Sequence, residues 1–229
     1  TIEGRRKDIN MDKIICLVGP SGSGKTTIAK ELEKEGYNVI QSYTTRKPRY
    51  EGEWGHTFIG DAGVLHKPKY QGIQNIAWIE DGIEKDSSNV IAFFNDYKKD
   101  EIYFATKEQY IGKGTSIYVV DPEGAEQVKE TVQLSPVITI FLMADEETRE
   151  ARLLYRTLIR EGLSEKEAKN TAEIRLLRNE NIATTDIPER IEKDREIFKT
   201  CKCDYVVDAN RELKEVVEDI KEIIEEREN

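Results

Sequence analysis

The sequence predicts an α/β domain of three layers, in which helices cover a mainly parallel sheet of five strands. Short apolar runs rich in β-forming residues recur along the chain, and helical stretches separate the later ones. The first run, KIICLVG at residues 13–19, ends at a glycine and has the continuous apolar character of a buried parallel strand. The other expected strands are residues 37–43, 115–121, 137–143 and 204–209.

Helical spacing of apolar residues follows several of these strands. Ile28, Ala29 and Leu32 share one face of a helix that Gly36 is expected to end. Further helices are expected at residues 123–131, 146–160, 165–181 and 212–228. The segment 57–106 differs, because Gly, Asp and Lys divide it into short mixed runs. We expect a small mixed or antiparallel insert there.

Composition excludes several classes of protein. The net charge of −10 argues against general nucleic-acid binding, which needs a basic surface. The longest apolar run, residues 137–144, is too short for a membrane span, and no secretory signal is visible. Three cysteines suit a reducing compartment, and a zinc site at Cys201 and Cys203 is improbable since no second pair exists. We expect a cytoplasmic protein, monomeric or homodimeric, with no membrane or nucleic-acid partner.

The first residues include Ile2-Glu3-Gly4-Arg5, which is typical of a protease site left by recombinant expression. Residues 1–10 are therefore expected to be such a remnant, and residues 11–229 to form one domain.

The strongest motif is GPSGSGKT at residues 19–26, which satisfies G-x-x-x-x-G-K-[ST] between a strand and a helix. Glycines allow backbone N–H groups to surround a phosphate, and the helix N-terminus adds a positive dipole. The lysine reaches the β and γ oxygens, and the threonine hydroxyl is a ligand for Mg²⁺. The motif predicts binding of a nucleoside triphosphate. The expected ATP-binding residues are Gly19, Ser21, Gly22, Ser23, Gly24, Lys25, Thr26 and Thr27.

Binding leaves the chemistry open, since GTPases, motor ATPases and small-molecule kinases share this loop. No N-K-x-D motif for guanine recognition follows it. A kinase needs a second anion site, and the segment with Ser42, Arg46, Lys47 and Arg49 comes at the end of the second expected strand, at the same edge of the sheet. Arginine forks suit phosphate, so this loop is the expected acceptor site.

A basic lid is expected at the helices that follow residue 146. Arg149, Arg152, Arg156 and Arg160 share one helix face through spacings of three and four. Ser164 and Glu167 form a capping box for the next helix, which carries Arg175 and Arg178. Two helices with cations along one side are typical of a lid that closes over phosphates.

With these residues in place, the chain resembles the guanylate kinases from about residue 13 to its C-terminus. The segments that carry the resemblance are GPSGSGKTT, SYTTRKPR with the Gly-Glu and TFI after it, VVDPEGAEQV, RLLYR and EIRL. The resemblance implies transfer of the γ-phosphate of ATP to GMP with Mg²⁺. It also implies a P-loop NTPase fold with a monophosphate-binding insert at about 42–106 and a helical lid at about 149–180.

The resemblance assigns roles by position. Ser42, Arg46 and Arg49 match the grip on the monophosphate, and Thr106 matches a hydroxyl residue that contacts guanine. Asp121 matches an acid near the guanine and the metal-bound phosphates, where it would reach Mg²⁺ through water, and Asp208 falls near the adenine. The implied catalytic cations are Lys25, Arg46, Arg49, Arg152, Arg156 and Arg175.

The chain departs from the family at three positions of the insert. His56 and Phe104 stand where the family has tyrosines that touch the acceptor phosphate, and no acid stands near Ala92 or Phe93, where its guanine-reading glutamate is expected. His56 either donates to phosphate or packs. Two alternatives stay open: a kinase for another nucleotide, deoxynucleotide or ribose bisphosphate, and a non-catalytic binding module. The intact loop argues against the module.

Overall fold

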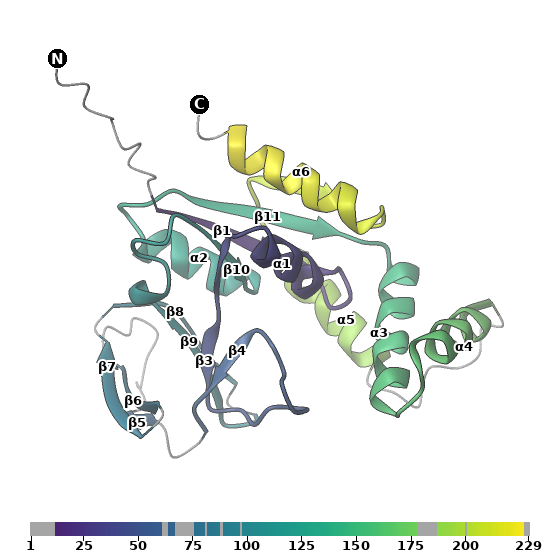
Figure 1. Ribbon diagram of the computed structural model, residues 1–229, viewed down its shortest axis with the longest axis horizontal. Coiled ribbons are helices and arrows are strands. Elements are labelled where there is room, and N and C mark those ends of the chain that lie inside the picture. Colours follow the sequence, from purple (N-terminus) through teal and green to yellow (C-terminus); the bar gives the residue numbers. More distant parts are fainter. Residues whose placement is uncertain are drawn as a thin grey trace. The chain divides into compact units, whose positions relative to one another are not determined.

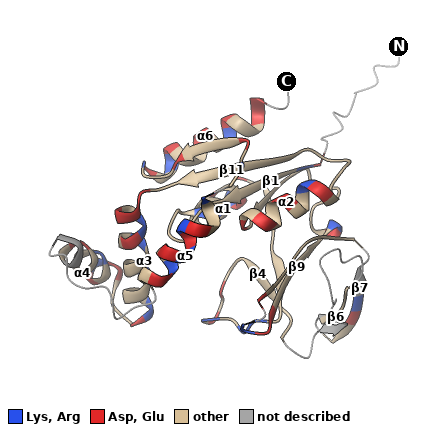
Figure 2. Cartoon of the chain, turned by 180° about the vertical axis from the view of Figure 1, so that it is seen from behind, with Lys and Arg blue, Asp and Glu red and all other residues tan. Residues whose placement is uncertain are grey.

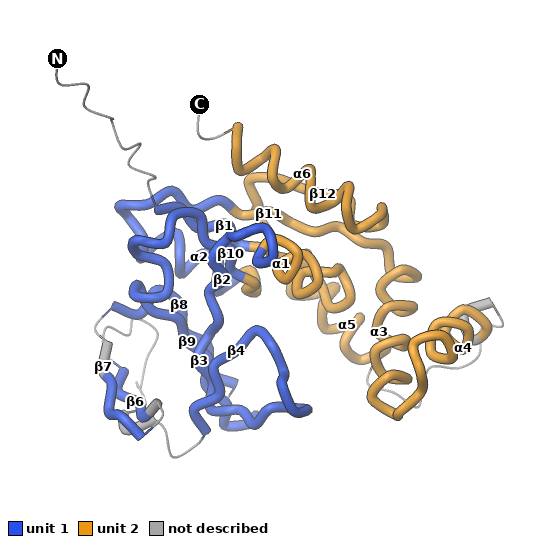
Figure 3. Tube along the Cα trace, viewed as in Figure 1, with its two compact units in different colours: residues 1–16, 33–118, 123–138 blue, residues 17–32, 119–122, 139–229 orange. Residues whose placement is uncertain are grey.

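The computed structural model describes residues 12–60, 64–66, 76–80, 82–87, 89–96, 98–177, 187–199 and 201–226 (Figure 1). The chain divides into two compact units (Figure 3). Unit 1 contains residues 1–16, 33–118 and 123–138, and unit 2 contains residues 17–32, 119–122 and 139–229.

The main sheet has five strands in the order β12-β11-β1-β10-β2. Strand β10 pairs in parallel with β2, and β11 in parallel with β12. Every residue of β1 is buried, including Cys16, which agrees with its continuous apolar run. The expected five-stranded parallel sheet is confirmed. Its strands are β1 (Lys13–Val18), β2 (Asn38–Ile40), β10 (Thr115–Val119), β11 (Val137–Met143) and β12 (Tyr205–Asp208).

The described residues contain six α-helices, and five of them lie where the sequence predicts them. The α1 helix is followed by Gly36, whose φ of 99° is one that side chains other than glycine rarely adopt. The sixth helix, α5, was not predicted, since only Ile187 and Ile191 mark its apolar face before a buried carboxylate, Asp194. The helices are α1 (Lys25–Lys34), α2 (Pro122–Thr131), α3 (Glu146–Arg160), α4 (Glu165–Leu177), α5 (Ile187–Phe198) and α6 (Leu213–Glu226).

Helices α3 and α4 form a hairpin around a small apolar core. The capping box is confirmed: Glu167 accepts from the amide and hydroxyl of Ser164 at 3.0 and 2.5 Å, and its own amide donates to the Ser164 hydroxyl at 3.4 Å. The core beneath them contains Leu153, Leu154, Leu158, Ala168, Ala172, Ile187 and Ile191, so α5 packs with the hairpin. Figure 2 shows charged residues of both signs along α3 and α5.

The expected second strand, residues 37–43, divides at Gln41. Its first half is β2 of the main sheet, and its second half is β3 of another sheet, ordered β4-β3-β9-β8. Strand β3 pairs in parallel with β4 and antiparallel with β9, so the insert is mixed as expected. A third sheet has the order β5-β6-β7. The strands of the insert are β3 (Ser42–Thr44), β4 (His56–Phe58), β5 (Val64–His66), β6 (Ile76–Glu80), β7 (Ile83–Ser87), β8 (Val90–Asp96) and β9 (Glu101–Thr106).

An aromatic core lies within the insert. Phe104 of β9 stacks on Tyr43 of β3 at 5.0 Å between ring centroids, and Trp78 of β6 meets its edge at 5.2 Å. Ile76, Val90 and Ile102 are buried in the same cluster. Among the described residues, no helix combines the length and the apolar character that crossing a bilayer requires.

Candidate nucleotide-binding and acceptor sites

The glycine-rich loop joins β1 to α1 within unit 2. Gly22 has a φ of 85°, and a Cβ on it would lie 2.8 Å from the carbonyl oxygen of Arg149. The loop therefore passes too close to α3 for any side chain at this position. Beside it, the Ser23 hydroxyl is fully buried and has no hydrogen-bond partner. Thr26 and Thr27, at the start of α1, are exposed.

Lys25 bends back over the loop, where its Nζ donates to the carbonyl oxygens of Gly19 at 2.5 Å and Pro20 at 3.0 Å. The pKa of Lys25 is lowered to about 8, mainly because the ammonium group is buried; the charges of Arg156, Arg149 and Arg190 contribute to the decrease, and Asp194 opposes it. A lysine in this setting is stabilised in its charged form by an added anion. The arrangement therefore favours an anionic ligand over the loop.

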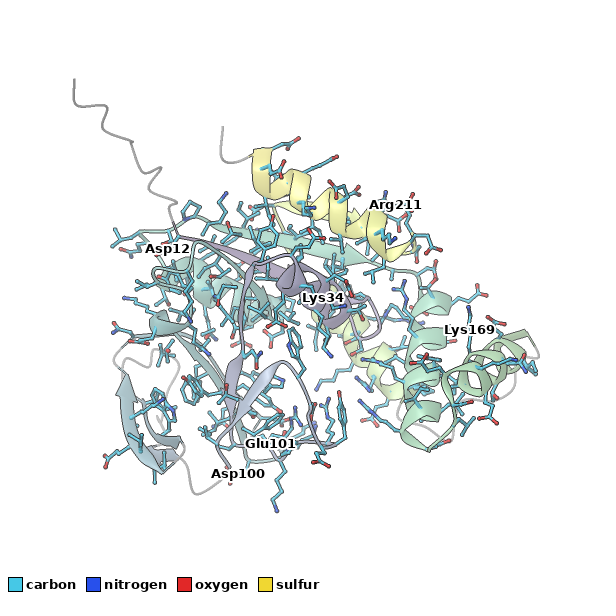
Figure 4. All side chains as sticks on the ribbon, in the orientation of Figure 1. Asp12, Lys34, Asp100, Glu101, Lys169 and Arg211 are labelled. Carbon is cyan, nitrogen blue, oxygen red and sulfur yellow. The ribbon has the colours of Figure 1, made fainter. Side chains whose placement is uncertain are left out.

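A cleft of about 920 Å³ opens beside the loop, and all of its lining belongs to unit 2. Its walls come from α1, α3, α4, α5 and the start of α6. Seven cations and two acids, Glu165 and Glu173, line it, which gives an excess of five positive charges in a protein of net charge −10. Such a cleft suits a polyanion. The cations are Lys25, Arg152, Arg156, Lys166, Lys169, Arg190 and Arg211, of which Figure 4 labels Lys169 and Arg211.

Two of the expected lid arginines lie at this cleft. Arg152 donates to the carbonyl oxygens of Gly22 at 3.3 Å and Ala209 at 2.8 Å, and burial lowers its pKa. Arg156, one turn further along α3, is exposed and also lines the cleft. Arg175 lies in α4, but its side chain is outside the described part of the structure. Arg178 is outside it altogether.

Arg149 has a different position from its neighbours on α3, because its side chain is buried. Its Nη2 donates to Asp194 of α5 at 2.6 Å, and its Nε donates to the carbonyl oxygen of Ser21 at 2.9 Å. The same Asp194 oxygen accepts from the Ser21 amide at 2.7 Å. A buried ion pair thus holds both sides of one residue of the phosphate loop. The sequence did not single out Asp194, since a lone acid in a charged helix carries no distinguishing pattern.

The remaining expected residues of unit 2 are acids that follow strands. The Asp208 carboxylate accepts from the amide and the side-chain nitrogen of Asn210 at 3.0 and 2.8 Å, so it shapes the turn before α6. Ala209, next to it, lines the cleft. Asp121, two residues beyond β10, is exposed.

Magnesium is compatible with the residues of the cleft. The exposed Thr26 lines it and offers a hard oxygen ligand. Among the described residues, no three His, Cys, Asp or Glu side chains gather closely enough to hold a metal ion. A magnesium ion at Thr26 would therefore take most of its ligands from phosphates and water, as it commonly does.

In unit 1, Glu53 organises the cations of the loop expected to bind the acceptor. The two terminal nitrogens of Arg46 donate to its carboxylate oxygens at 3.0 and 3.1 Å, and the Arg49 amide donates at 2.6 Å. Burial alone would raise the pKa of Glu53, but these hydrogen bonds and both guanidinium charges lower it. The buried Arg46 Nε has no hydrogen-bond partner, while the Arg49 side chain is exposed. The cluster therefore keeps an exposed cation and an unused donor.

His56 lies beside this cluster, opposite Ser42 in the register of β3 and β4. Burial, followed by the charge of Arg46, lowers the pKa of His56 to about 4, so its ring is neutral at pH 7. Its Nδ1 is buried without a hydrogen-bond partner. The Ser42 hydroxyl lies 3.0 Å from the hydroxyl of Tyr118.

Tyr103 supplies a hydroxyl on this face of the insert. Side chains alternate along β9, so Phe104 points into the aromatic core with an exposed fraction of 1%, and Tyr103 points the other way. The Tyr103 ring lies 5.6 Å from that of His56, and its hydroxyl donates to Glu101 at 2.9 Å. Burial and Glu101 raise the pKa of Tyr103, and nearby Arg46 lowers it. By its resemblance to the guanylate kinases, the sequence aligns Phe104 with a tyrosine that touches the acceptor phosphate. In the structure, Phe104 faces the aromatic core, and the neighbouring Tyr103 faces the His56 side.

Thr106 ends β9 and is 1% exposed. Its amide donates to the side chain of Gln109 at 3.1 Å, which fixes the turn after the strand.

Two known proteins with similar sequences have the same name. A protein of Prochlorococcus marinus named guanylate kinase is 29% identical over 69% of this chain and 77% of its own length. One from the Wolbachia of Brugia malayi, also named guanylate kinase, is 27% identical over 94% of this chain and 93% of its own. These comparisons support the guanylate kinase family. With identities of 27% and 29%, they indicate a nucleotide kinase, which is a transferase.

The crystal structure of a guanylate kinase from Anaplasma phagocytophilum has a similar fold. Its TM-score is 0.51 and its identity 16%, over 95% of this chain and 87% of that one. No protein-family model matches the chain.

The His56 ring predicts a dependence of stability on pH. Because its folded pKa of about 4 lies below the unfolded value of about 6.5, the unfolded chain binds the proton first as pH falls. Protonation of His56 therefore has no effect on the free energy of unfolding above about pH 6.5. As the pH falls toward 4, it lowers that free energy by up to about 3 kcal/mol. In urea unfolding between pH 7 and 4.5, His56→Gln should lose less stability than the wild type. Equal losses would refute a buried neutral ring.

The Arg149–Asp194 pair predicts a second effect on stability. Asp194→Asn leaves a buried guanidinium without its counter-charge, which should lower the free energy of unfolding by about 3 kcal/mol. The matched control is Glu146→Gln, which breaks the exposed ion pair between Glu146 of α3 and Arg195 of α5. This change should lower the free energy of unfolding by only a fraction of that amount. Urea unfolding of both variants measures the difference. Similar losses would mean that the buried pair does not stabilise the loop.

Proposed function

We propose that the protein is an ATP-dependent nucleoside-monophosphate kinase that converts GMP and ATP to GDP and ADP. The observation that carries the proposal is the cationic cleft around the glycine-rich loop, where Lys25 and six further cations suit a triphosphate. Its relatives named guanylate kinase support GMP as the acceptor. Within this proposal, residues 11–229 form one guanylate-kinase-like domain, with the acceptor insert at 42–106 and the lid at 149–180.

Transfer to a monophosphate needs little covalent help from the protein. The acceptor phosphate is already anionic, so it attacks the γ-phosphate without a general base. Catalysis then consists of positioning and neutralising charge. Lys25 binds the β and γ oxygens, while Arg152 and Arg156 from α3, with Arg175 from α4, stabilise the charge on the group in transfer.

Thr26 would hold magnesium directly and Asp121 through water. When bound, the ion neutralises the β and γ oxygens and orients them. Gly19, Ser21, Gly22, Ser23, Gly24 and Thr27 complete the cradle of the phosphates, and Asp208 lies by the adenine.

The acceptor phosphate would bind at the cluster that Glu53 organises. Arg49 supplies an exposed cation, and the unused Arg46 Nε supplies a donor. The Tyr103 hydroxyl turns from Glu101 to the phosphate, and neutral His56 offers a ring nitrogen beside it. Ser42 adds a hydroxyl, and Thr106 contacts the base.

Another acceptor is the second candidate, and the composition of β8 favours it. Ala92 is 5% exposed, and the Phe93 amide donates to Gln127 at 2.8 Å, so this part of the strand offers no carboxylate to read guanine. A site without such an acceptor loses much of its discrimination between bases. Another nucleotide, a deoxynucleotide or ribose bisphosphate then competes with GMP.

An acceptor panel tests the proposal. ADP release is followed with ATP, Mg²⁺ and each of GMP, dGMP, AMP, CMP, UMP and ribose bisphosphate. We expect the highest kcat/KM with GMP and its loss in Lys25→Ala, because the loop cation is removed. No ADP with any acceptor would refute the kinase, and turnover with only a non-guanine acceptor would refute the GMP assignment. The variant must keep the thermal transition of the wild type.

Tyr103→Phe tests the acceptor grip. Losing one hydrogen bond to a charged phosphate should raise the KM for the monophosphate by about tenfold or more, with the KM for ATP unchanged. Tyr43→Phe is the matched control, since Tyr43 lies in the adjacent strand and faces the aromatic core. Steady-state kinetics with each substrate varied measure both constants. A rise of equal size in the control would place the effect in the core.

A further inference from the structure

Two cysteines lie together at a place that the proposed reaction does not use. Cys201 and Cys203 stand in the short segment between α5 and β12, with their Sγ atoms 3.1 Å apart. Both side chains are half-buried. The third cysteine, Cys16, is fully buried in β1. The pair is therefore the accessible thiol site among the described residues.

The backbone on each side of the pair is anchored. The Cys201 amide donates to the carbonyl oxygen of Phe198 at 3.3 Å, and the Phe198 ring lies 5.9 Å from Phe141 of β11. After the pair, the Asp204 carboxylate accepts from the amide and hydroxyl of Thr139 at 2.7 and 2.8 Å. The Asp204 amide donates back to the Thr139 hydroxyl at 3.0 Å. These contacts hold the thiols close, which raises the effective concentration of one toward the other.

We propose that Cys201 and Cys203 form a redox-active dithiol that closes reversibly to an intramolecular disulfide. The oxidant is a low-molecular-weight disulfide. One protein thiolate attacks a sulfur of that disulfide, its S–S bond breaks, and one small thiol leaves. The second protein thiolate then attacks the mixed disulfide and releases the other small thiol. Both protein protons pass to the two leaving thiols, and the protein gains one S–S bond while the oxidant loses one.

The surroundings make this bond labile. The ring closed by residues 201–203 contains one intervening residue, so it constrains the unfolded chain little and adds little stability. Accessible disulfides have the more oxidising potentials and serve as exchangeable bonds, and both sulfur-bearing side chains here are only half-buried. Lys199 and Lys202 are exposed on either side of Cys201, which favours the approach of an anionic disulfide such as oxidised glutathione.

Redox titration of the full chain tests the site. The protein is equilibrated with mixtures of reduced and oxidised glutathione, quenched with acid and alkylated, and its mass is measured intact and after proteolysis. We expect a species that lacks two of the alkyl groups carried by the reduced protein, with the bond between Cys201 and Cys203, and full return to the dithiol as reduced glutathione increases. The oxidised fraction should rise with the ratio of oxidised glutathione to the square of reduced glutathione.

Three variants serve as controls. Cys16→Ala should titrate as the wild type, while Cys201→Ser and Cys203→Ser should lose the bond and instead retain one glutathione. Absence of the bond in the wild type, a stable glutathione adduct in place of it, or the same titration in Cys201→Ser would each overturn the proposal. Peptide mapping of the wild type gives the answer even where a variant folds poorly.

Discussion

The buried ion pair of Arg149 and Asp194 is the interaction on which the phosphate loop of unit 2 depends. A glycine-rich loop is entropically costly to fix, because its residues have many alternative conformations. Here the carbonyl oxygen of Ser21 accepts from Arg149 and the Ser21 amide donates to Asp194, so α3 and α5 together hold the peptide groups on both sides of this loop residue. Each charge is buried only because the other is present. The cleft beside the loop is thus organised before any ligand arrives.

In unit 1, too, an acidic side chain orients the cations and the backbone of a loop. Glu53 fixes the fork of Arg46 and the backbone of Arg49, so the acceptor loop is ordered by a carboxylate that leaves some donors unused. In both units, an internal acid orients cations and lowers the cost of gathering like charges. In the proposed reaction, an incoming phosphate would meet groups that are already positioned, and such preorganisation is what phosphoryl transfer mainly needs from a protein.

Much of this was predictable from local patterns. The parallel strands, the phosphate loop and the capping box at Ser164 each depend on a few adjacent residues, and all three are in the structure. Features that depend on tertiary pairing were not predictable. Whether Tyr103 or Phe104 faces the acceptor cluster depends on the register of β9 against β3, and a shift of one residue reverses every side chain. Asp194 acquires its role only because α5 packs beside the loop.

The charged groups of both units suit a phosphate, but they do not distinguish one base from another. Burial, and to a smaller extent the neighbouring cations, lower the pKa of Lys25, and a bound phosphate would favour its charged form. His56 is held neutral beside Arg46, so it can take part in hydrogen bonds without adding charge. Both groups could interact with a phosphate, which every nucleotide carries. The buried, apolar side chain of Ala92 cannot form hydrogen bonds with the polar edge of a base. For the proposed kinase, affinity for phosphate would therefore come from the charged clusters, and base selectivity from the remaining polar contacts of the insert.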